Sequence, residues 1–327
     1  MITLVMCPQK SKPTPKNDAW RRLGELTGFY KPGAGPNLPG FSLRLGDGSL
    51  WWIAGSPEAA SIAEKLAAIM ELEEGDPEDA HLMFFYERHA DQQWFKHPRL
   101  QDQGWSNLRH FFYRLSFHPR LRHFLGEYDK SNPNSSPYGM MCEALPSIHW
   151  ESICRGGLPF HAALLEFQGQ GVILAAAGET GKSTCCRRLP PPWRARCDDE
   201  VLAVLSPQGR YLAHPFPTWT DYLWERAPNT WKVEAAVPLA GIFFFEQAPE
   251  DDCVPLKDVD AAVAAITSAG QVMGRFLSWC DAGEARRLRL NMFDNACEIV
   301  KQVPTFHLRV SLTGKFWDKI KAALDWQ

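Results

Sequence analysis

Gly171-Val-Ile-Leu-Ala-Ala-Ala-Gly-Glu-Thr-Gly-Lys-Ser-Thr184 joins an apolar run to a glycine-bearing turn and then to a Gly-Lys-Ser-Thr sequence. This order predicts a buried strand, a tight turn and the start of a helix, which together are typical of a phosphate-binding P-loop. In such a loop the backbone N–H groups converge on anionic oxygens, and the N-terminus of the helix adds partial positive charge. Pro190-Pro-Pro192 follows closely and predicts that the helix is short.

The residues of the predicted loop have different tasks. The Lys182 ammonium is able to reach the β- and γ-phosphates of a nucleotide, and the Ser183 hydroxyl is a suitable ligand for Mg²⁺. The usual P-loop pattern has glycine where this chain has Ala176, and Gly178 supplies turn freedom two residues later. An ordinary strand, turn and helix is the alternative interpretation. The predicted nucleotide-binding residues are Ala177, Gly178, Glu179, Thr180, Gly181, Lys182, Ser183 and Thr184.

Two adjacent carboxylates, Asp198 and Asp199, stand directly before Glu200 and the apolar run 201–205. A carboxylate at the end of a strand near a P-loop is suited to Mg²⁺ coordination. A pair allows one carboxylate to hold the metal while the other accepts a proton from an attacking hydroxyl. A solvated acidic turn is the alternative interpretation.

His161 opens an apolar run, 160–167, that is joined by a tight turn to the strand entering the P-loop. The two runs are therefore predicted to form a hairpin, with His161 near the phosphate-binding turn. A histidine in an apolar strand is also a common packed, hydrogen-bonded core residue, and the residues alone do not choose between these roles.

Bulk properties exclude several classes of protein. A chain of 327 residues with 45% hydrophobic residues is long enough for two domains, or one large one, with a substantial core. Its net charge of −3 provides no general attraction to nucleic acid or to an acidic membrane, and no apolar run is long enough to span a bilayer. The nine cysteines are scattered without a CxxC pair, and the N-terminus has no secretory pattern. We therefore expect a cytoplasmic protein with reduced thiols, no nucleic-acid partner and no membrane partner.

Composition divides the chain into three predicted parts: an irregular Pro/Gly-rich arm over 1–40, a small α/β domain over 41–130 and a P-loop domain over 131–327. In the small domain, a hairpin is predicted over 41–53, and a helix capped by Ser56 is predicted to follow. Residues 94–124 are dense in aromatic residues and cations. We favour two amphipathic helices with solvated arginines there, and a docking face for an anionic or peptide partner is the alternative. The six histidines of 81–123 lack metal-ligand spacing.

The P-loop domain is predicted to contain alternating strands and helices. The expected strands are 160–167, 171–177, 201–205, 210–213, 239–245 and 307–311, and the expected helices after the P-loop helix are 258–267, 285–301 and 316–326.

His161-Ala-Ala163, the hairpin into the P-loop and Cys197-Asp-Asp199 together resemble the HPr kinase/phosphorylase-like group. That group includes smaller relatives encoded with ribosomally made peptides, such as the lasso-peptide kinases and the kinase-like member of the SynChlorMet cassettes. The runs Gly156–Ala162 and Val303–Arg309 are also similar to those relatives. The resemblance covers roughly residues 150–320 and is moderately specific.

The resemblance implies an α/β protein, of the α+β mixed-sheet kind, in which a phosphoenolpyruvate-carboxykinase-like P-loop kinase core follows the small N-terminal domain. It implies ATP and Mg²⁺ as cofactors and phosphate transfer to a serine or threonine hydroxyl of a peptide or protein, including the precursor of a ribosomal natural product. Asp198 would be the general base, Asp199 its metal-linked partner and His161 a supporting residue. Lys182, Ser183 and Thr184 would hold phosphates and metal, with Ser183 and Asp199 as the metal ligands.

The chain departs from that group in three ways. Ala176 replaces the usual glycine, and 213–219 reads Ala-His-Pro-Phe-Pro-Thr-Trp where HPr kinases carry a glycine-rich signature. Neither HPr as a substrate nor phosphorylase activity is therefore implied. The 1–130 region has no recognisable counterpart and is available for substrate recognition.

Three functions stay open at this point: a peptide or protein kinase, a non-catalytic nucleotide-binding partner in a peptide-modification complex, and a kinase or hydrolase for a small molecule. An arginine is expected to assist phosphate transfer, with Arg187, Arg275 and Arg287 as candidates. A homo-oligomer is compatible with the sequence.

Overall fold

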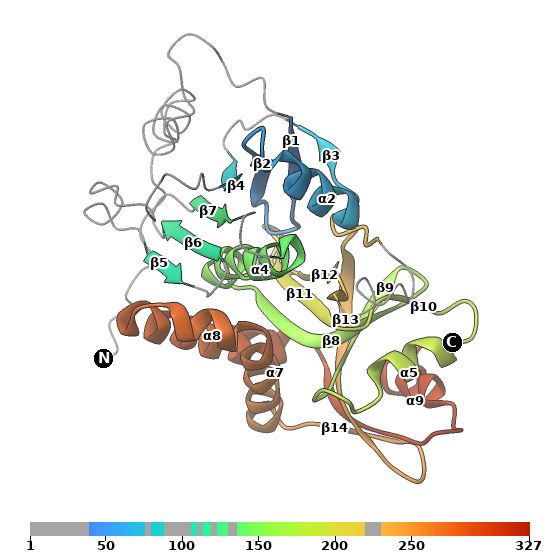
Figure 1. The fold of residues 1–327 in the computed structure, drawn as a ribbon. Helices are drawn as coiled ribbons and strands as arrows, with labels where there is room; N and C mark the ends of the chain where they lie inside the picture. The colour runs from blue at the N-terminus through green and yellow to red at the C-terminus, as the bar shows by residue number, and fades with distance from the viewer. Residues whose placement is uncertain are drawn as a thin grey trace. The chain divides into compact units, whose positions relative to one another are not determined.

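The computed structural model describes residues 39–75, 80–87, 106–109, 113–118, 123–129, 136–219 and 230–327. These residues form six helices and two mixed sheets, which confirms the predicted mixed α/β class (Figure 1). They belong to two compact units. The first unit comprises the described parts of Met1–Leu43, Leu50–Ala67 and Glu73–Ala144, and the second comprises Arg44–Ser49, Ala68–Leu72 and the described parts of Leu145–Gln327. The predicted domain ranges 41–130 and 131–327 stay a prediction, and the predicted arm over 1–40 lies almost wholly outside the described residues.

The first unit is built on a seven-stranded sheet in the order β3-β1-β2-β4-β7-β6-β5. The pairs β2–β4 and β4–β7 are parallel, whereas β1–β3, β5–β6 and β6–β7 are antiparallel. The interior of central strand β4, residues 82–86, is an unbroken apolar run, as is typical of a strand buried on both faces. The strands are β1 Gly40–Arg44, β2 Leu50–Gly55, β3 Glu73–Glu74, β4 His81–Glu87, β5 Ser106–Arg109, β6 Tyr113–His118 and β7 His123–Tyr128.

The helices predicted within 94–124 are wrong for the part of that range which the structure describes. Residues 106–109 and 113–118 are strands β5 and β6, and β7 starts at His123. Leu115 and Phe117 are both buried and stand two residues apart, which is the spacing of one face of a strand. The aromatic density therefore reflects strand periodicity.

Arg114 is a second correction in this range, because it is 4% exposed and not a solvated arginine. It lies opposite Glu127 in the antiparallel β6–β7 register. The Glu127 carboxylate accepts a hydrogen bond from the Tyr86 hydroxyl at 3.3 Å, and burial raises the pKa of Tyr86 well above its usual value. Burial of the arginine is tolerated here because a carboxylate is placed across the sheet from it.

The second unit is built on an eight-stranded sheet in the order β10-β8-β11-β12-β13-β15-β14, with β9 paired to both β8 and β13. The pairings of β8, β11, β12, β13 and β9 therefore form a closed circuit. Among the described strands of this second unit, only β9–β13 and β13–β15 are parallel pairs. The strands are β8 Leu158–Phe167, β9 Gln170–Ala175, β10 Arg194–Cys197, β11 Glu200–Leu205, β12 Tyr211–Phe216, β13 Val237–Gln247, β14 Asp252–Pro255 and β15 Thr305–Val310.

Short helices α5 (Lys182–Arg188) and α9 (Phe316–Ala323) lie next to each other in the second unit (Figure 1). Both contribute to the apolar core formed on β8, β9, β13 and β15, through Cys185, Phe316 and Ile320. The Arg188 guanidinium lies 5.4 Å from the centre of the Phe316 ring and donates hydrogen bonds to the carbonyls of Ser311 and Gly314. Arg188 is thus a structural residue that ties α5 to the segment before α9.

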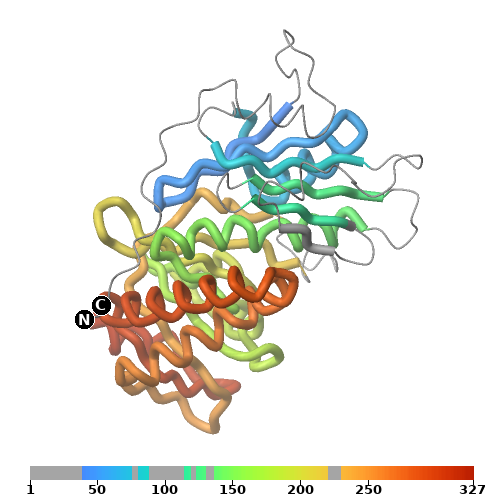
Figure 2. The backbone as a smooth tube through the Cα atoms, turned by 90° about the vertical axis from the view of Figure 1, so that its left-hand side faces the viewer, coloured from blue at the N-terminus to red at the C-terminus, as the bar shows by residue number. Residues whose placement is uncertain are grey.

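The two long helices α7 (Asp258–Trp279) and α8 (Ala282–Gln302) are consecutive in the sequence of the second unit (Figure 2). Asp281 caps α8 by accepting hydrogen bonds from the backbone N–H groups of Gly283 and Glu284. Asn295 of α8 donates to the carbonyls of Ile153 and Gly157 at 2.7 and 2.8 Å. These bonds hold α8 against the chain that leads into β8.

Most predicted elements of the second unit are present with shifted ends, and three were missed. α7 continues to Trp279, well beyond the predicted end at Thr267, because its apolar spacing persists through buried Met273 and Phe276. Strands β10 and β14 were not predicted, and neither was α4 (Pro137–Cys154), which contains Pro146. In the first unit, α2 (Ala60–Met70) starts later than predicted, and the buried Ser56 hydroxyl has no hydrogen-bond partner, so Ser56 does not cap it. No helix of the described residues is long and apolar enough to cross a membrane.

Acidification is expected to weaken the second unit through His214. The His214 imidazole is buried, donates from Nδ1 to the Val233 carbonyl at 2.7 Å and accepts the Gly46 N–H at Nε2 at 2.9 Å. Burial lowers the pKa of His214 below its usual 6.5. The unfolded chain therefore binds a proton first as the pH falls below about 6.5, and stability is lost from there down to the folded-state pKa, by at most about 1.4 kcal/mol per pH unit.

The check is urea unfolding of wild type and His214→Gln at pH 7.5 and pH 5.5. The glutamine amide can still donate and accept but does not titrate in this range, so the variant should lose less stability on acidification. The other histidines titrate in both proteins, and an equal loss in both would contradict the prediction.

Candidate active site

The strand, turn and helix predicted from the opening motif are present at the expected residues. Strand β9 ends at Ala175, and α5 begins at Lys182. The turn between them uses two residues with left-handed backbone, Glu179 at φ 61° and Gly181 at φ 103°. The Thr180 hydroxyl donates to the Ala177 carbonyl at 2.8 Å, and the Gln247 amide of β13 donates to the Thr180 carbonyl at 3.0 Å.

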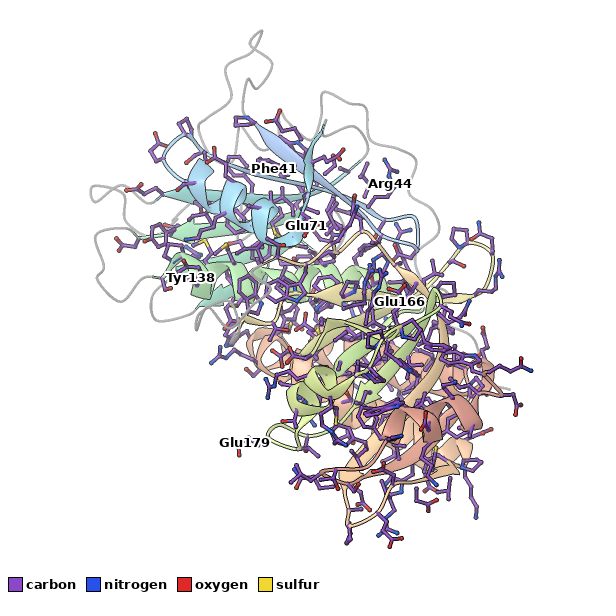
Figure 3. All side chains as sticks on the ribbon, turned by 90° about the vertical axis from the view of Figure 1, so that its right-hand side faces the viewer. Phe41, Arg44, Glu71, Tyr138, Glu166 and Glu179 are labelled. Carbon is purple, nitrogen blue, oxygen red and sulfur yellow. The ribbon has the colours of Figure 1, made fainter. Side chains whose placement is uncertain are left out.

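The outer part of this turn is accessible. Ala177, Gly178 and Glu179 are exposed, and Figure 3 shows Glu179 at the edge of the second unit. Ser183 and Thr184, the first residues after Lys182, are half-buried. An exposed backbone over a buried lysine is compatible with an anionic ligand resting on the turn.

Gly181→Ala is expected to lower the free energy of unfolding by about 1–2 kcal/mol, because an L-residue is strained at this positive φ. Gly178→Ala is the matched control. A Cβ at position 178 meets only His161 Cε1, at an ordinary 3.9 Å, and the backbone there is not left-handed. Urea unfolding of both variants should separate them, and equal losses would contradict the assigned backbone of the turn.

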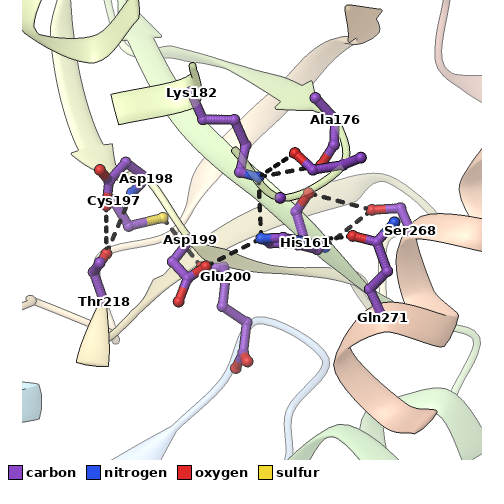
Figure 4. A network of polar contacts seen from close by, with 12 residues as sticks. His161, Ala176, Lys182, Cys197, Asp198, Asp199, Glu200, Thr218, Ser268 and Gln271 are labelled. Carbon is purple, nitrogen blue, oxygen red and sulfur yellow. Dashed lines mark hydrogen bonds and ion pairs between the residues drawn. The ribbon is translucent and has the colours of Figure 1, made fainter. Parts of the chain in front are cut away.

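Lys182 lies beneath the turn and is only 7% exposed. Its ammonium donates to the carbonyls of Ala176 and Ala177 at 3.1 and 3.3 Å and lies 3.0 Å from His161 Nε2. Burial lowers the pKa of Lys182, and the nearby carboxylates of Asp199 and Asp198 oppose that effect. The structure thus places Lys182 at the centre of a polar network (Figure 4).

His161 connects this lysine to the acidic pair. It precedes Ala162, which pairs with Ala175 at the end of β9, so the β8–β9 register brings the imidazole to the turn. His161 Nε2 lies 3.2 Å from Asp199 Oδ1, and this contact raises the pKa of the imidazole despite partial burial and the nearby Lys182. Nε2 serves one neighbour at a time: protonated, it donates to Asp199, and unprotonated, it accepts from Lys182.

Two residues of α7 hold His161 from the other side. The Gln271 side-chain oxygen makes a short contact with His161 Nδ1, and the Ser268 hydroxyl accepts the His161 backbone N–H at 2.9 Å. With Gln271 oxygen facing it, Nδ1 carries the proton, which leaves Nε2 for Lys182 or Asp199. Neither residue was predicted, because both are more than 100 positions away in the chain and no local pattern marks them.

Asp198 and Asp199 form the bend between β10 and β11, two strands that both pair with β8. The Asp199 backbone carbonyl accepts the Ala162 N–H at 2.9 Å, which fixes the bend against β8. The two side chains have different partners: Asp199 contacts His161, whereas Asp198 accepts a hydrogen bond from the Thr218 hydroxyl at 2.7 Å. Thr218 was also missed by sequence reasoning.

Two further groups complete the surroundings of the acidic bend. Burial raises the pKa of the Cys197 thiol to about 12, so the thiol is protonated at neutral pH and is unsuited to act as a nucleophile. Glu200 Oε1 lies 2.5 Å from Nε2 of His149, which is fully buried. Glu200 is therefore engaged with α4 rather than with Lys182.

The structure places His161 in direct contact with both Lys182 and Asp199, and Asp198 is adjacent to Asp199 in the chain. The predicted metal ligands do not complete a cage of their own: no group of three His, Cys, Asp or Glu residues suited to a metal occurs in the described part of the chain. A metal held by Ser183 and Asp199 would need further oxygens from a ligand or from water. Of the three arginine candidates, Arg187 donates to Thr184 Oγ1 at 3.4 Å and Arg287 lies 3.7 Å from Glu284.

Comparison with known protein families identifies the family of this chain. The family model of the SynChlorMet cassette protein ScmC matches residues 125–325, which is well over half of the chain and includes the whole polar network. The chain belongs to the ScmC family. This confirms the SynChlorMet part of the predicted resemblance and extends it toward the N-terminus from about residue 150 to residue 125. No curated protein matches the chain significantly.

Proposed function

We propose that this ScmC-family chain is a kinase that transfers the γ-phosphate of ATP, with Mg²⁺, to a serine or threonine hydroxyl of a peptide or protein. The observation that carries the proposal is the contact of His161 with both Lys182 and Asp199 beneath an exposed turn, with a second carboxylate, Asp198, next in the chain. Phosphate transfer needs a cation for the phosphates, a metal ligand and a proton acceptor at one place.

The residues present fit ATP and Mg²⁺. Lys182 is a buried ammonium at the base of the turn, and its contacts to two loop carbonyls are of the kind that a phosphate oxygen can replace. Ser183 and Asp199 would hold Mg²⁺, which when bound neutralises charge on the phosphates. Oxygen ligands of this kind are the ones that Mg²⁺ prefers.

Each protein group then has one task. Lys182 would exchange the carbonyls of Ala176 and Ala177 for phosphate oxygens and fix them by charge. Asp198 would accept the proton of the attacking hydroxyl. His161, held at Nδ1 by Gln271, would position Lys182 and Asp199 relative to each other.

The family supports a peptide as acceptor. A SynChlorMet cassette association is consistent with a peptide-modification context, although the family name states no reaction. We also propose that the chain is related more widely to the HPr kinase-like group and has a phosphoenolpyruvate-carboxykinase-like core. We propose a cytoplasmic location for it as well.

A non-catalytic nucleotide-binding partner is the second candidate, and one observation favours it. When His161 Nε2 is unprotonated, all three ammonium protons of Lys182 have acceptors within the chain, Ala176, Ala177 and His161. Ala176 itself also replaces the usual glycine. A turn closed in this way could bind nucleotide as a structural ligand without transferring phosphate.

The test is incubation of the purified protein with γ-labelled ATP and Mg²⁺ and a serine-bearing peptide encoded beside it, with the same peptide carrying Ser→Ala as control. Label on the serine peptide alone, lost when Mg²⁺ is chelated, would support the kinase. Tight ATP binding without transfer would favour the binding partner. If the protein shows no ATP binding and no phosphate transfer, both proposals are overturned.

A further inference from the structure

Thr218 reaches the acidic bend by an extension of the β11–β12 pairing. In that antiparallel pair, Glu200 stands opposite Phe216 and Val201 opposite Pro215. The same register, continued by two residues past the end of each strand, places Thr218 opposite Asp198. Pro217 has a fixed φ, which limits the positions that Thr218 can adopt after the buried Phe216.

Thr218 is itself 3% exposed, and its hydroxyl donates to Asp198 Oδ1 at 2.7 Å. The Asp198 backbone N–H also points toward this hydroxyl, at 3.5 Å. Because Thr218 is buried and Asp198 is only half-buried, the contact fixes a solvent-reaching carboxylate from its inner side. One oxygen of Asp198, Oδ1, is thereby engaged by the Thr218 hydroxyl.

The two neighbouring carboxylates therefore differ in their partners. Asp199 contacts an imidazole that in turn contacts the Lys182 ammonium, whereas Asp198 is held by a neutral hydroxyl. A neutral donor orients a carboxylate without pairing its charge. This difference suits Asp199 to the cationic cluster and Asp198 to proton acceptance.

We propose that Thr218 is a positioning residue that holds Asp198 Oδ1 so that Oδ2 faces the acceptor hydroxyl. This inference rests on the proposed kinase function. It also gives a task to the segment 213–219, which stands where a glycine-rich signature was expected and which supplies Thr218.

The kinetic test compares wild type with Thr218→Val, which keeps the shape but removes the hydroxyl, and with Thr218→Ser, which restores the hydroxyl. Thr218→Val should lower kcat for peptide phosphorylation about 10- to 100-fold, the loss expected for one hydrogen bond to a charged group. KM for ATP and for peptide should change less than about twofold, since Thr218 contacts neither ligand in this arrangement. Thr218→Ser should recover most of the rate, and an unchanged kcat in Thr218→Val would overturn the proposal.

A crystallographic arm decides the inference even if no phosphate transfer is found. The Asp198 carboxylate should keep its orientation in wild type and Thr218→Ser and lose it in Thr218→Val. An unchanged carboxylate in Thr218→Val would overturn the positioning role, whatever the activity. Absence of transfer by wild type would instead count against the proposed kinase. Thr218→Ala serves the same comparison if the valine variant does not fold.

Discussion

Asp198→Asn is expected to lower peptide phosphorylation about 10²- to 10⁴-fold, the range associated with removal of a general base. The asparagine keeps the shape of the side chain, and its Oδ1 can still accept the Thr218 hydroxyl that holds Asp198 at 2.7 Å. ATP affinity should therefore stay within about twofold of wild type. The measurement is transfer of label from ATP to peptide beside ATP binding by calorimetry.

Asp199→Asn is the matched comparison, because it makes the same change one residue away. Asp199 contacts His161, so its loss should raise the Mg²⁺ concentration needed for half-maximal rate and disturb the Lys182 network. Full phosphorylation activity in Asp198→Asn would refute the base assignment, and equal behaviour of the two variants would refute the division of roles.

Lys182→Met is expected to reduce kcat/KM for ATP about 10²- to 10³-fold, the cost of removing one preorganised group that stabilises developing charge. Methionine keeps most of the side-chain length but places no charge under the turn. Thermal stability should not fall in parallel, because the change also removes a buried cation whose lowered pKa reflects the cost of its burial.

Lys319→Met, at an exposed position of α9, provides the control, since it makes the same substitution outside the network. It should leave both ATP binding and transfer at wild-type levels. If Lys182→Met behaves like Lys319→Met, the turn after β9 does not bind nucleotide phosphates, and the kinase and binding-partner proposals both fail.

Local chemistry explains why the region around Lys182 could be predicted. The apolar run of β9, the left-handed Gly181 and the prolines after α5 act over a few residues, so their consequences are visible in the sequence. The hairpin of β8 and β9 is likewise local, and it placed His161 next to the turn as predicted.

Predictions failed where periodicity was ambiguous. In 94–124, the closely spaced aromatic residues fit a helical pattern as well as the alternation of a strand, which β6 follows. The arginines of this range were expected to face solvent, but Arg114 is buried opposite Glu127. Helix α4 was missed because Pro146 lies inside it and interrupts the usual signal.

The sequence by itself determined the mixed α/β class and the strand, turn and helix that carry Lys182, because apolar spacing and glycine freedom act between near neighbours. Only the tertiary structure decided which residues support the site. Gln271 meets His161 across 110 positions, and Thr218 meets Asp198 across 20, through helix placement and strand register. Such contacts depend on how the whole sheet pairs, and a one-residue change of register would direct the same side chains elsewhere.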